Sequence, residues 1–116
     1  MKKIYLTILL IFFYSCGDVL KPNCDESANS NRETECLIIF DKLPAFSTPY
    51  LNAKGKNLLT GKECECEDIG RWWIQYKEYL KKGDTIIKKK GELIFSIHKK
   101  DTVLRFNYEC NDKVYK

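Results

Sequence analysis

The stretch DTIIKKKGELIFSIHKKDTVLRFNY, residues 84–108, alternates strand-like runs with turn residues and decides the fold class. Its three runs, 85–87, 93–97 and 102–108, are rich in β-branched and aromatic residues, and a Gly or a Lys-Lys-Asp segment separates them. In the second and third runs, large apolar residues occupy every second position and therefore share one face of a strand. The pattern predicts an antiparallel meander whose core face carries Leu93, Phe95, Ile97, Leu104, Phe106 and Tyr108.

An apolar run upstream, residues 36–40 (CLIIF), predicts one more buried strand. The following stretch, from Asp41 to Glu67, is interrupted repeatedly by Pro and Gly. We expect this stretch to be mostly loop, with a short strand at residues 58–59.

Residues 68–82 (DIGRWWIQYKEYLKK) fit two kinds of secondary structure. Their apolar residues recur at helical spacing, which indicates a helix. Trp72, Ile74 and Tyr76 also alternate as a strand would, and the aromatic density favours this interpretation. We therefore expect a mainly β fold, a small antiparallel meander or roll stabilised by disulfides, with one short helix around residues 68–81 as the alternative.

The first fifteen residues are typical of an export signal. Lys2 and Lys3 precede an uncharged apolar run, residues 4–14, and small Ser15 and then Cys16 follow it. As a helix, this run would span only ~17 Å, well short of the ~30 Å hydrocarbon core of a membrane. The run is therefore predicted to be a signal peptide rather than a transmembrane anchor.

The arrangement of residues 2–17 resembles the signal of bacterial lipoproteins, in which cleavage occurs just before a lipid-modified cysteine. The resemblance implies acyl chains such as palmitate on Cys16 and a place in the cell envelope, anchored to the outer membrane. Phe13 and Tyr14 are bulkier than the residues usual in this family's cleavage box. Two alternatives therefore remain open, an ordinary signal peptide cut near Ser15 and an uncleaved, membrane-inserted N-terminus.

The remaining length and charge describe one small domain. Without residues 1–15, the chain has 101 residues, enough for one domain and too few for two. We expect residues 16–35, which are polar, to form a lipidated tether and residues 36–116 to form the domain. Loss of the two N-terminal lysines lowers the net charge from +4 to +2. This weak charge in an exported protein argues against nucleic acid as a partner.

Cysteine usage predicts disulfides. An exported protein meets an oxidising environment, and an odd number of cysteines remains after Cys16, which permits at most two bridges within the chain. Cys64 and Cys66 are too close in sequence to pair comfortably with each other. A plausible set joins Cys24 to Cys36 and Cys110 to either of the other two, and it leaves one thiol. A bridge at Cys24 would also shorten the tether.

No catalytic group is recognisable, so the sequence predicts a protein that is not an enzyme and uses no cofactor. His98, the single histidine, ends a predicted strand, where it is most simply a turn residue. Cys64 and Cys66 form the one motif with chemical potential, because two thiolates on one face can bind Zn²⁺ or Cu(I) or cycle with a disulfide. Further ligands are missing nearby, so structural disulfides are favoured and no metal site is predicted.

Two patterns suggest binding. Trp72, Trp73 and Tyr76 are interleaved with cations, which can bind a sugar or a peptide, although an aromatic core with solvated lysines is the simpler explanation. If any of these rings is exposed, Trp72 and Trp73 are the candidates, because in a strand they would point to opposite faces. Three lysines at residues 88–90 can contact an anionic surface, but protection of an exposed strand edge is their favoured role.

These observations support three hypotheses. The leading one is a lipid-anchored extracytoplasmic binding or interaction module, with a protein or glycan partner at Trp72 and Trp73. The second is an immunity-type or inhibitor protein that acts at the envelope. The third is metal or redox handling through Cys64 and Cys66.

Overall fold

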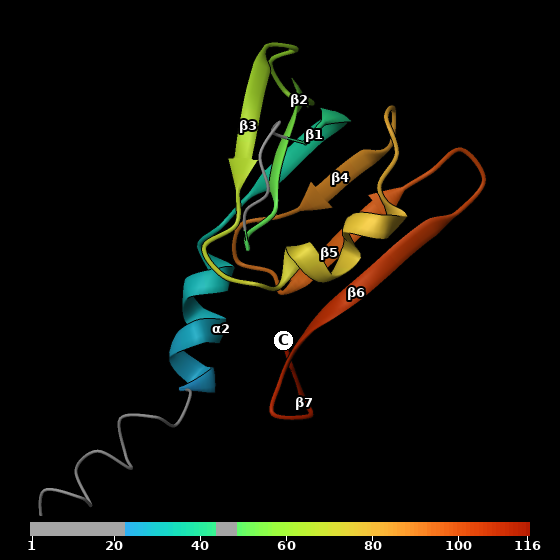
Figure 1. The fold of residues 1–116 in the computed structure, drawn as a ribbon. Helices are drawn as coiled ribbons and strands as arrows, with labels where there is room; N and C mark the ends of the chain where they lie inside the picture. Colours follow the sequence, from blue (N-terminus) through green and yellow to red (C-terminus); the bar gives the residue numbers. More distant parts are fainter. Residues whose placement is uncertain (1–22, 44–48) are drawn as a thin grey trace, which may run out of the picture.

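The computed structural model describes residues 23–43 and 49–116 and is mainly β. Seven strands form an antiparallel sheet in the order β3-β2-β1-β4-β5-β6-β7, accompanied by two short helices (Figure 1). The elements are α2 (Cys24–Arg32), β1 (Cys36–Lys42), β2 (Asn52–Asn57), β3 (Glu63–Glu67), the 3₁₀-helix η1 (Trp73–Tyr79), β4 (Thr85–Lys88), β5 (Ile94–His98), β6 (Val103–Cys110) and β7 (Lys113–Tyr115). The expected mainly β fold is confirmed.

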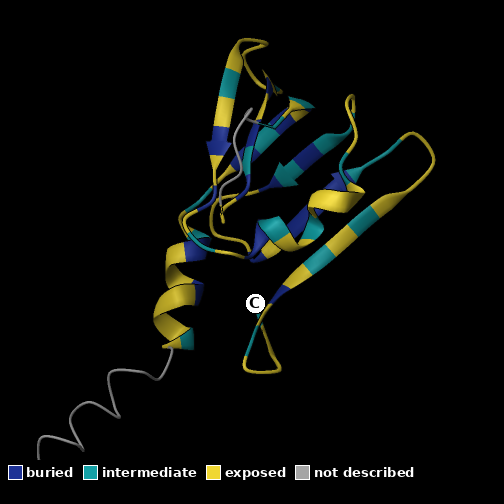
Figure 2. Ribbon diagram, viewed as in Figure 1, coloured by how far each residue is buried: buried dark blue, intermediate teal, exposed yellow. Residues whose placement is uncertain are grey.

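The meander predicted from residues 84–108 is present as β4, β5 and β6. Ile86 pairs with Ile97, and Ile97 pairs with Leu104, so these side chains share one face of the sheet. Ile86, Phe95 and Ile97 are fully buried on this core face. Exposed and half-buried residues alternate along most of β6, which is visible as alternating bands (Figure 2).

The segment before β4 contains the short helix η1, so the helical alternative for residues 68–81 is confirmed and the favoured strand interpretation is wrong. Asp68 organises the start of η1, because its carboxylate oxygens accept hydrogen bonds from Trp73 N at 2.9 Å and Gly70 N at 3.3 Å. The helix then lays its aromatic side chains on the meander. Trp73 stacks on Phe95, with ring centroids 5.5 Å apart, and Tyr76 stacks on Phe106 at 3.9 Å. A strand would have directed alternate rings away from this core.

The expected loop between residues 41 and 67 contains two strands, β2 and β3, so that prediction is also wrong. Residues 58–59, predicted as a strand, lie in the turn between β2 and β3. Gly55 permits the close approach of β2 to β1, because a Cβ there would lie 2.0 Å from the carbonyl oxygen of Ile39. The end of β3 returns toward the beginning of β1 (Figure 1), where Cys66 and Cys36 form a disulfide.

Two disulfides join parts of the chain that are distant in sequence. They are Cys24–Cys110 and Cys36–Cys66, and Cys64 is the free cysteine among the described residues. The number of bridges and the leftover thiol agree with expectation. Both predicted pairings, Cys24 with Cys36 and Cys110 with Cys64 or Cys66, are wrong. Cys24 instead begins α2, and its Cα lies 5.8 Å from that of Cys110 at the end of β6.

Residues 24–32 of the expected tether are the helix α2, which the sequence analysis did not predict. Asn23 caps this helix, because its side chain accepts a hydrogen bond from Glu26 N at 3.1 Å. Ala28 and Asn31 are buried against the domain, and the rest of the helix is mostly exposed (Figure 2). The predicted signal peptide, Cys16 and the first part of the tether lie outside the described residues.

Candidate interaction surface

The aromatic residues singled out for binding belong to the core. Trp72 and Trp73 are 3 % and 0 % exposed, respectively, and Tyr76 is half-buried. Trp72 Nε1 donates a hydrogen bond to Tyr76 Oη at 3.1 Å, and the Trp72 ring meets Tyr108 edge-on at 5.3 Å. Both tryptophans are therefore core residues, as the simpler explanation predicts, and the ligand-binding surface predicted at Trp72, Trp73 and Tyr76 is wrong.

Lys88 does not protect a sheet edge, because β4 lies between β1 and β5 in the interior of the sheet. The side chain is fully buried and ends at the last turn of α2. Its Nζ donates hydrogen bonds to the carbonyl oxygens of Asn31 at 2.6 Å, Thr34 at 2.7 Å and Arg32 at 3.4 Å. The predicted edge role is wrong, and Lys88 instead fixes the C-terminal end of the helix to the sheet.

Burial sets the electrostatics of three ionisable core groups. It lowers the pKa of Lys88 to about 8, although the nearby carboxylates of Glu92 and Glu35 oppose the shift. Burial also raises the pKa of Asp68 and the pKa of Tyr76 above their ordinary values. All three side chains form hydrogen bonds to other groups of the domain, and these bonds hold the helices and the core in place.

The cysteine pair proposed for chemistry is divided. Cys66 is bonded to Cys36, and Cys64 remains as a half-buried thiol on the same strand. Within residues 23–43 and 49–116, no three His, Cys, Asp or Glu side chains gather closely enough to hold a metal ion. Cys66 therefore cannot serve as the second thiolate while its disulfide is intact. His98, at the end of β5, is half-buried opposite Thr85.

The face of the sheet opposite the core carries apolar side chains among polar ones such as Thr85, Ser96 and His98. Residues directly opposite each other on neighbouring strands share a face. Leu37 pairs with Ile87 and alternates with the buried residues of β1, so both point away from the core. We call the apolar residues of this face the outer strip, and they are Leu37, Ile39, Ile87, Ile94 and Val103.

The outer strip is partly open to solvent. Ile39, Ile94 and Val103 are 45 %, 38 % and 39 % exposed. Both helices lie on the other side, since η1 stacks on Phe95 and α2 contributes Ala28 to the same core. Antiparallel sheets with one solvated face normally place polar residues there, so these three exposed apolar side chains are candidate contacts for another molecule.

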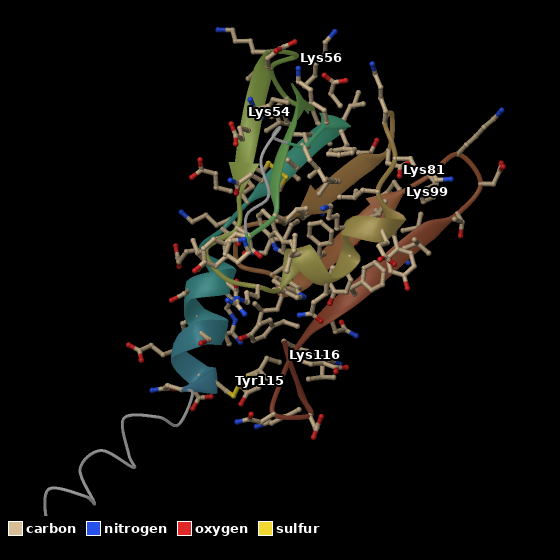
Figure 3. The ribbon with its side chains drawn as sticks, in the orientation of Figure 1. Lys54, Lys56, Lys81, Lys99, Tyr115 and Lys116 are labelled. Carbon is tan, nitrogen blue, oxygen red and sulfur yellow. A yellow bond between two sulfur atoms is a disulfide. The ribbon has the colours of Figure 1, made fainter. Side chains whose placement is uncertain are left out.

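A groove of about 720 Å³ adjoins the outer strip and shares Ile39 with it. It is lined by residues 39–42 of β1, 54–56 of β2, 63–65 of β3 and 82–83 of the turn before β4. Lysines and acids both border the groove, and Lys82 forms an ion pair with Asp41 at 3.3 Å. Figure 3 shows Lys54 and Lys56 on the β2–β3 hairpin beside this region.

Residues of opposite charge face each other across the β2–β3 hairpin, beside the groove. Lys54 lies directly opposite Glu65, and Lys56 lies directly opposite Glu63. An apolar strip beside such a mixed-charge border resembles a protein-binding surface, in which an apolar centre is surrounded by a polar rim. It lacks the uniformly cationic character that binding of a polyanion requires.

Comparisons of the chain with known proteins found no relative. No family model, no curated protein and no solved structure matches the chain. No helix within the described ranges combines the length and apolarity needed to cross a membrane.

The outer strip is not predicted from the sequence, although the sequence of β1 carries a signal for it. The β1 run CLIIF is apolar at every position, which is typical of a strand covered on both faces. It was interpreted only as a buried strand. In the structure, one face of β1 meets the core and the other carries Ile39 into solvent.

Proposed function

We propose that this protein is a lipid-anchored extracytoplasmic interaction module, with its lipid on Cys16 and a protein partner on the outer strip. The observation that carries the proposal is the exposure of Ile39, Ile94 and Val103 on a sheet face that neither helix covers. The adjoining groove supports it, because it supplies charged groups of both signs at one border of the strip. A glycan partner is less well supported, since the tryptophans that would stack on sugar rings are in the core.

The lipid anchor is tested by mass spectrometry of the protein purified from envelopes. The N-terminal peptide is expected to begin at Cys16 and to carry acyl chains. Cys16→Ser protein is expected to lose this modification and to leave the membrane fraction. An unmodified Cys16 in membrane-derived protein would refute the lipoprotein interpretation.

The partner surface is tested with Ile39→Lys and Ile94→Lys variants in cells treated with a chemical crosslinker. A buried isoleucine contributes ~1.5–3 kcal/mol, so losing the exposed half of Ile39 from an interface costs about 1 kcal/mol, and burying an ammonium adds to this. We expect recovery of the crosslinked partner to fall about tenfold or more, which corresponds to ~1.4 kcal/mol.

Leu59→Lys is the matched control, because Leu59 is 79 % exposed in the β2–β3 turn and lies outside the outer strip. Val114→Lys, in β7, is a second control on another exposed residue. Both controls are expected to retain the partner. Equal recovery with all four variants would exclude the outer strip as the binding surface. The identity of the captured protein also tests the immunity-type hypothesis, which requires a toxin.

A further inference from the structure

We propose that the domain stands on the membrane on one fixed end, so that the groove faces away from the bilayer. The end toward the bilayer, called the anchor pole, consists of residues 23–26 and 110–113. The opposite end, called the far pole, consists of the turns at residues 81–84 and 99–102. The inference rests on the proposed lipid at Cys16, and it adds the orientation and the lipid-facing surface.

The chain joins the folded domain at the anchor pole. The Cys24–Cys110 disulfide bonds the first residue of α2 to the last residue of β6. The attachment point cannot swing away from the domain, because α2 is also held at its other end by Lys88. A lipid on Cys16 would therefore pull on the anchor pole.

The two poles lie at opposite ends of the strands. β6 runs from the turn at residues 99–102 to Cys110, and its eight residues span ~25 Å. Figure 1 shows the start of α2 and the β6–β7 turn at one end, and the η1–β4 and β5–β6 turns at the other. The groove includes Lys82 and Gly83 from a far-pole turn.

The chain length between Cys16 and Cys24 restricts the orientation. Eight Cα-to-Cα steps reach at most ~29 Å, and a flexible segment of this length spans ~16 Å on average. Placing the far pole on the bilayer would require the segment to run back along the whole length of β6, nearly fully extended. Contact of the anchor pole with the headgroups needs no such extension, so this orientation has the greater conformational freedom.

The anchor pole carries the exposed acids Asp25, Glu26 and Asp112, and tyrosines and lysines lie beside it. Tyr115 packs edge-on against Tyr108, with ring centroids 6.1 Å apart, and Lys113 Nζ lies 5.1 Å from the Tyr115 ring centroid. Tyrosines and lysines of this kind keep a polar end in water while their apolar parts contact a membrane interface. Figure 3 places Tyr115 and Lys116 at this end, and Lys56, Lys81 and Lys99 toward the other.

The test is paramagnetic broadening of backbone amide signals in the acylated full-length protein on lipid nanodiscs. The probe is a phospholipid with a nitroxide on its headgroup, and diamagnetic nanodiscs give the reference. We expect broadening at residues 24–26 and 110–113 to exceed broadening at residues 82–84 and 100–102 at least fivefold. Equal broadening, or stronger broadening at the far pole, in protein bound to the nanodisc would overturn the proposed orientation.

Failure of the lipid anchor gives a different result. Protein without a lipid would elute separately from the nanodiscs, and it would contradict the proposed function before any broadening is measured. A variant with twenty Gly/Ser residues inserted between Pro22 and Asn23 tests the role of chain length. We expect the contrast between the poles to fall below twofold in this variant. A contrast that persists would overturn the argument from chain length.

Discussion

Replacing Lys88 with Met should change how folding stability depends on pH. The buried ammonium has a pKa of about 8 in the folded protein, against 10.5 for the ordinary side chain. Below pH 8 the group is charged in both states, so its contribution is constant. Between pH 8 and 10.5 the folded protein releases this proton before the unfolded chain does. The unfolded state then binds more protons, and the free energy of unfolding rises with pH.

The size of the effect follows from the two pKa values. At pH 7 the contribution of this titration is close to zero. At pH 9.5 most folded molecules carry a neutral amine and most unfolded molecules an ammonium, which stabilises the fold by about 2 kcal/mol relative to neutral pH. Lys88→Met protein lacks this pH-dependent contribution to the free energy of unfolding. The stability difference between wild type and variant should therefore shift by about 2 kcal/mol in favour of the wild type between these pH values.

The assay is urea unfolding followed by the fluorescence of Trp72 and Trp73, which leave the core on unfolding. Both proteins carry Cys64→Ser, which prevents the free thiol from exchanging with the disulfides at high pH. Because wild type and variant share every other titrating group, only Lys88 contributes to the change in their difference. A difference that stays constant from pH 7 to pH 9.5 would refute the lowered pKa.

Three further results are expected. Gly55→Ala should destabilise the fold by about 3 kcal/mol or more in urea unfolding, because its Cβ would lie 2.0 Å from a β1 carbonyl oxygen. In the control variant Gly70→Ala, the new Cβ meets nothing within 4 Å, so stability should change by less than about 0.5 kcal/mol. The Cys24→Ser, Cys110→Ser double variant should lose about 4 kcal/mol, since the bridge closes a loop with a sequence separation of 86. Thiol titration of the acylated protein, unfolded without reductant, should find one free thiol, at Cys64; any other count contradicts the observed pairing.

The predicted strands were those in which local pattern and tertiary packing agree. β5 has large apolar residues at alternate positions and a turn on either side. The residues at these alternate positions, Leu93, Phe95 and Ile97, are the ones buried on the core face of the meander. Such agreement makes a strand recognisable without knowledge of its neighbours.

β2 and β3 were missed because their sequences have low strand propensity. NAKGKN and ECECE contain small, charged and glycine residues. They form strands because β1 pairs with β2, and because the Cys36–Cys66 disulfide holds the end of β3 in place. These are long-range constraints, which no local pattern reveals.

The helices were difficult to predict for a related reason. α2 has the polar sequence CDESANSNR, without an apolar stripe, and it depends on a disulfide at its start and on Lys88 at its end. η1 was expected to be a strand because its aromatic residues alternate. The flat aromatic surface of Phe95 and Phe106 accepts stacked rings from one side, which a helix provides and a strand does not.

The interaction surface was also difficult to predict, because it depends on tertiary structure rather than on local pattern. Trp72 and Trp73 attracted attention because large aromatic residues are common in binding sites, but they are also the residues that contribute most to a small core. The exposed positions were ordinary isoleucines and a valine, whose role depends on which face of the sheet they occupy. That information comes from strand order and register, and it became available only with the structure.

The Cys24–Cys110 disulfide also determines how the domain bears a mechanical load. A force that pulls on the chain before residue 24 passes through the disulfide into β6 and bypasses the contacts of α2. β6 is paired with β5 from Val103 to Asn107, and the pull acts along the strand. The interstrand hydrogen bonds are then loaded together in shear, whereas in the reduced protein the same pull would peel α2 from Lys88 one contact at a time. Oxidation thus converts a weak, sequential mode of rupture into a cooperative one.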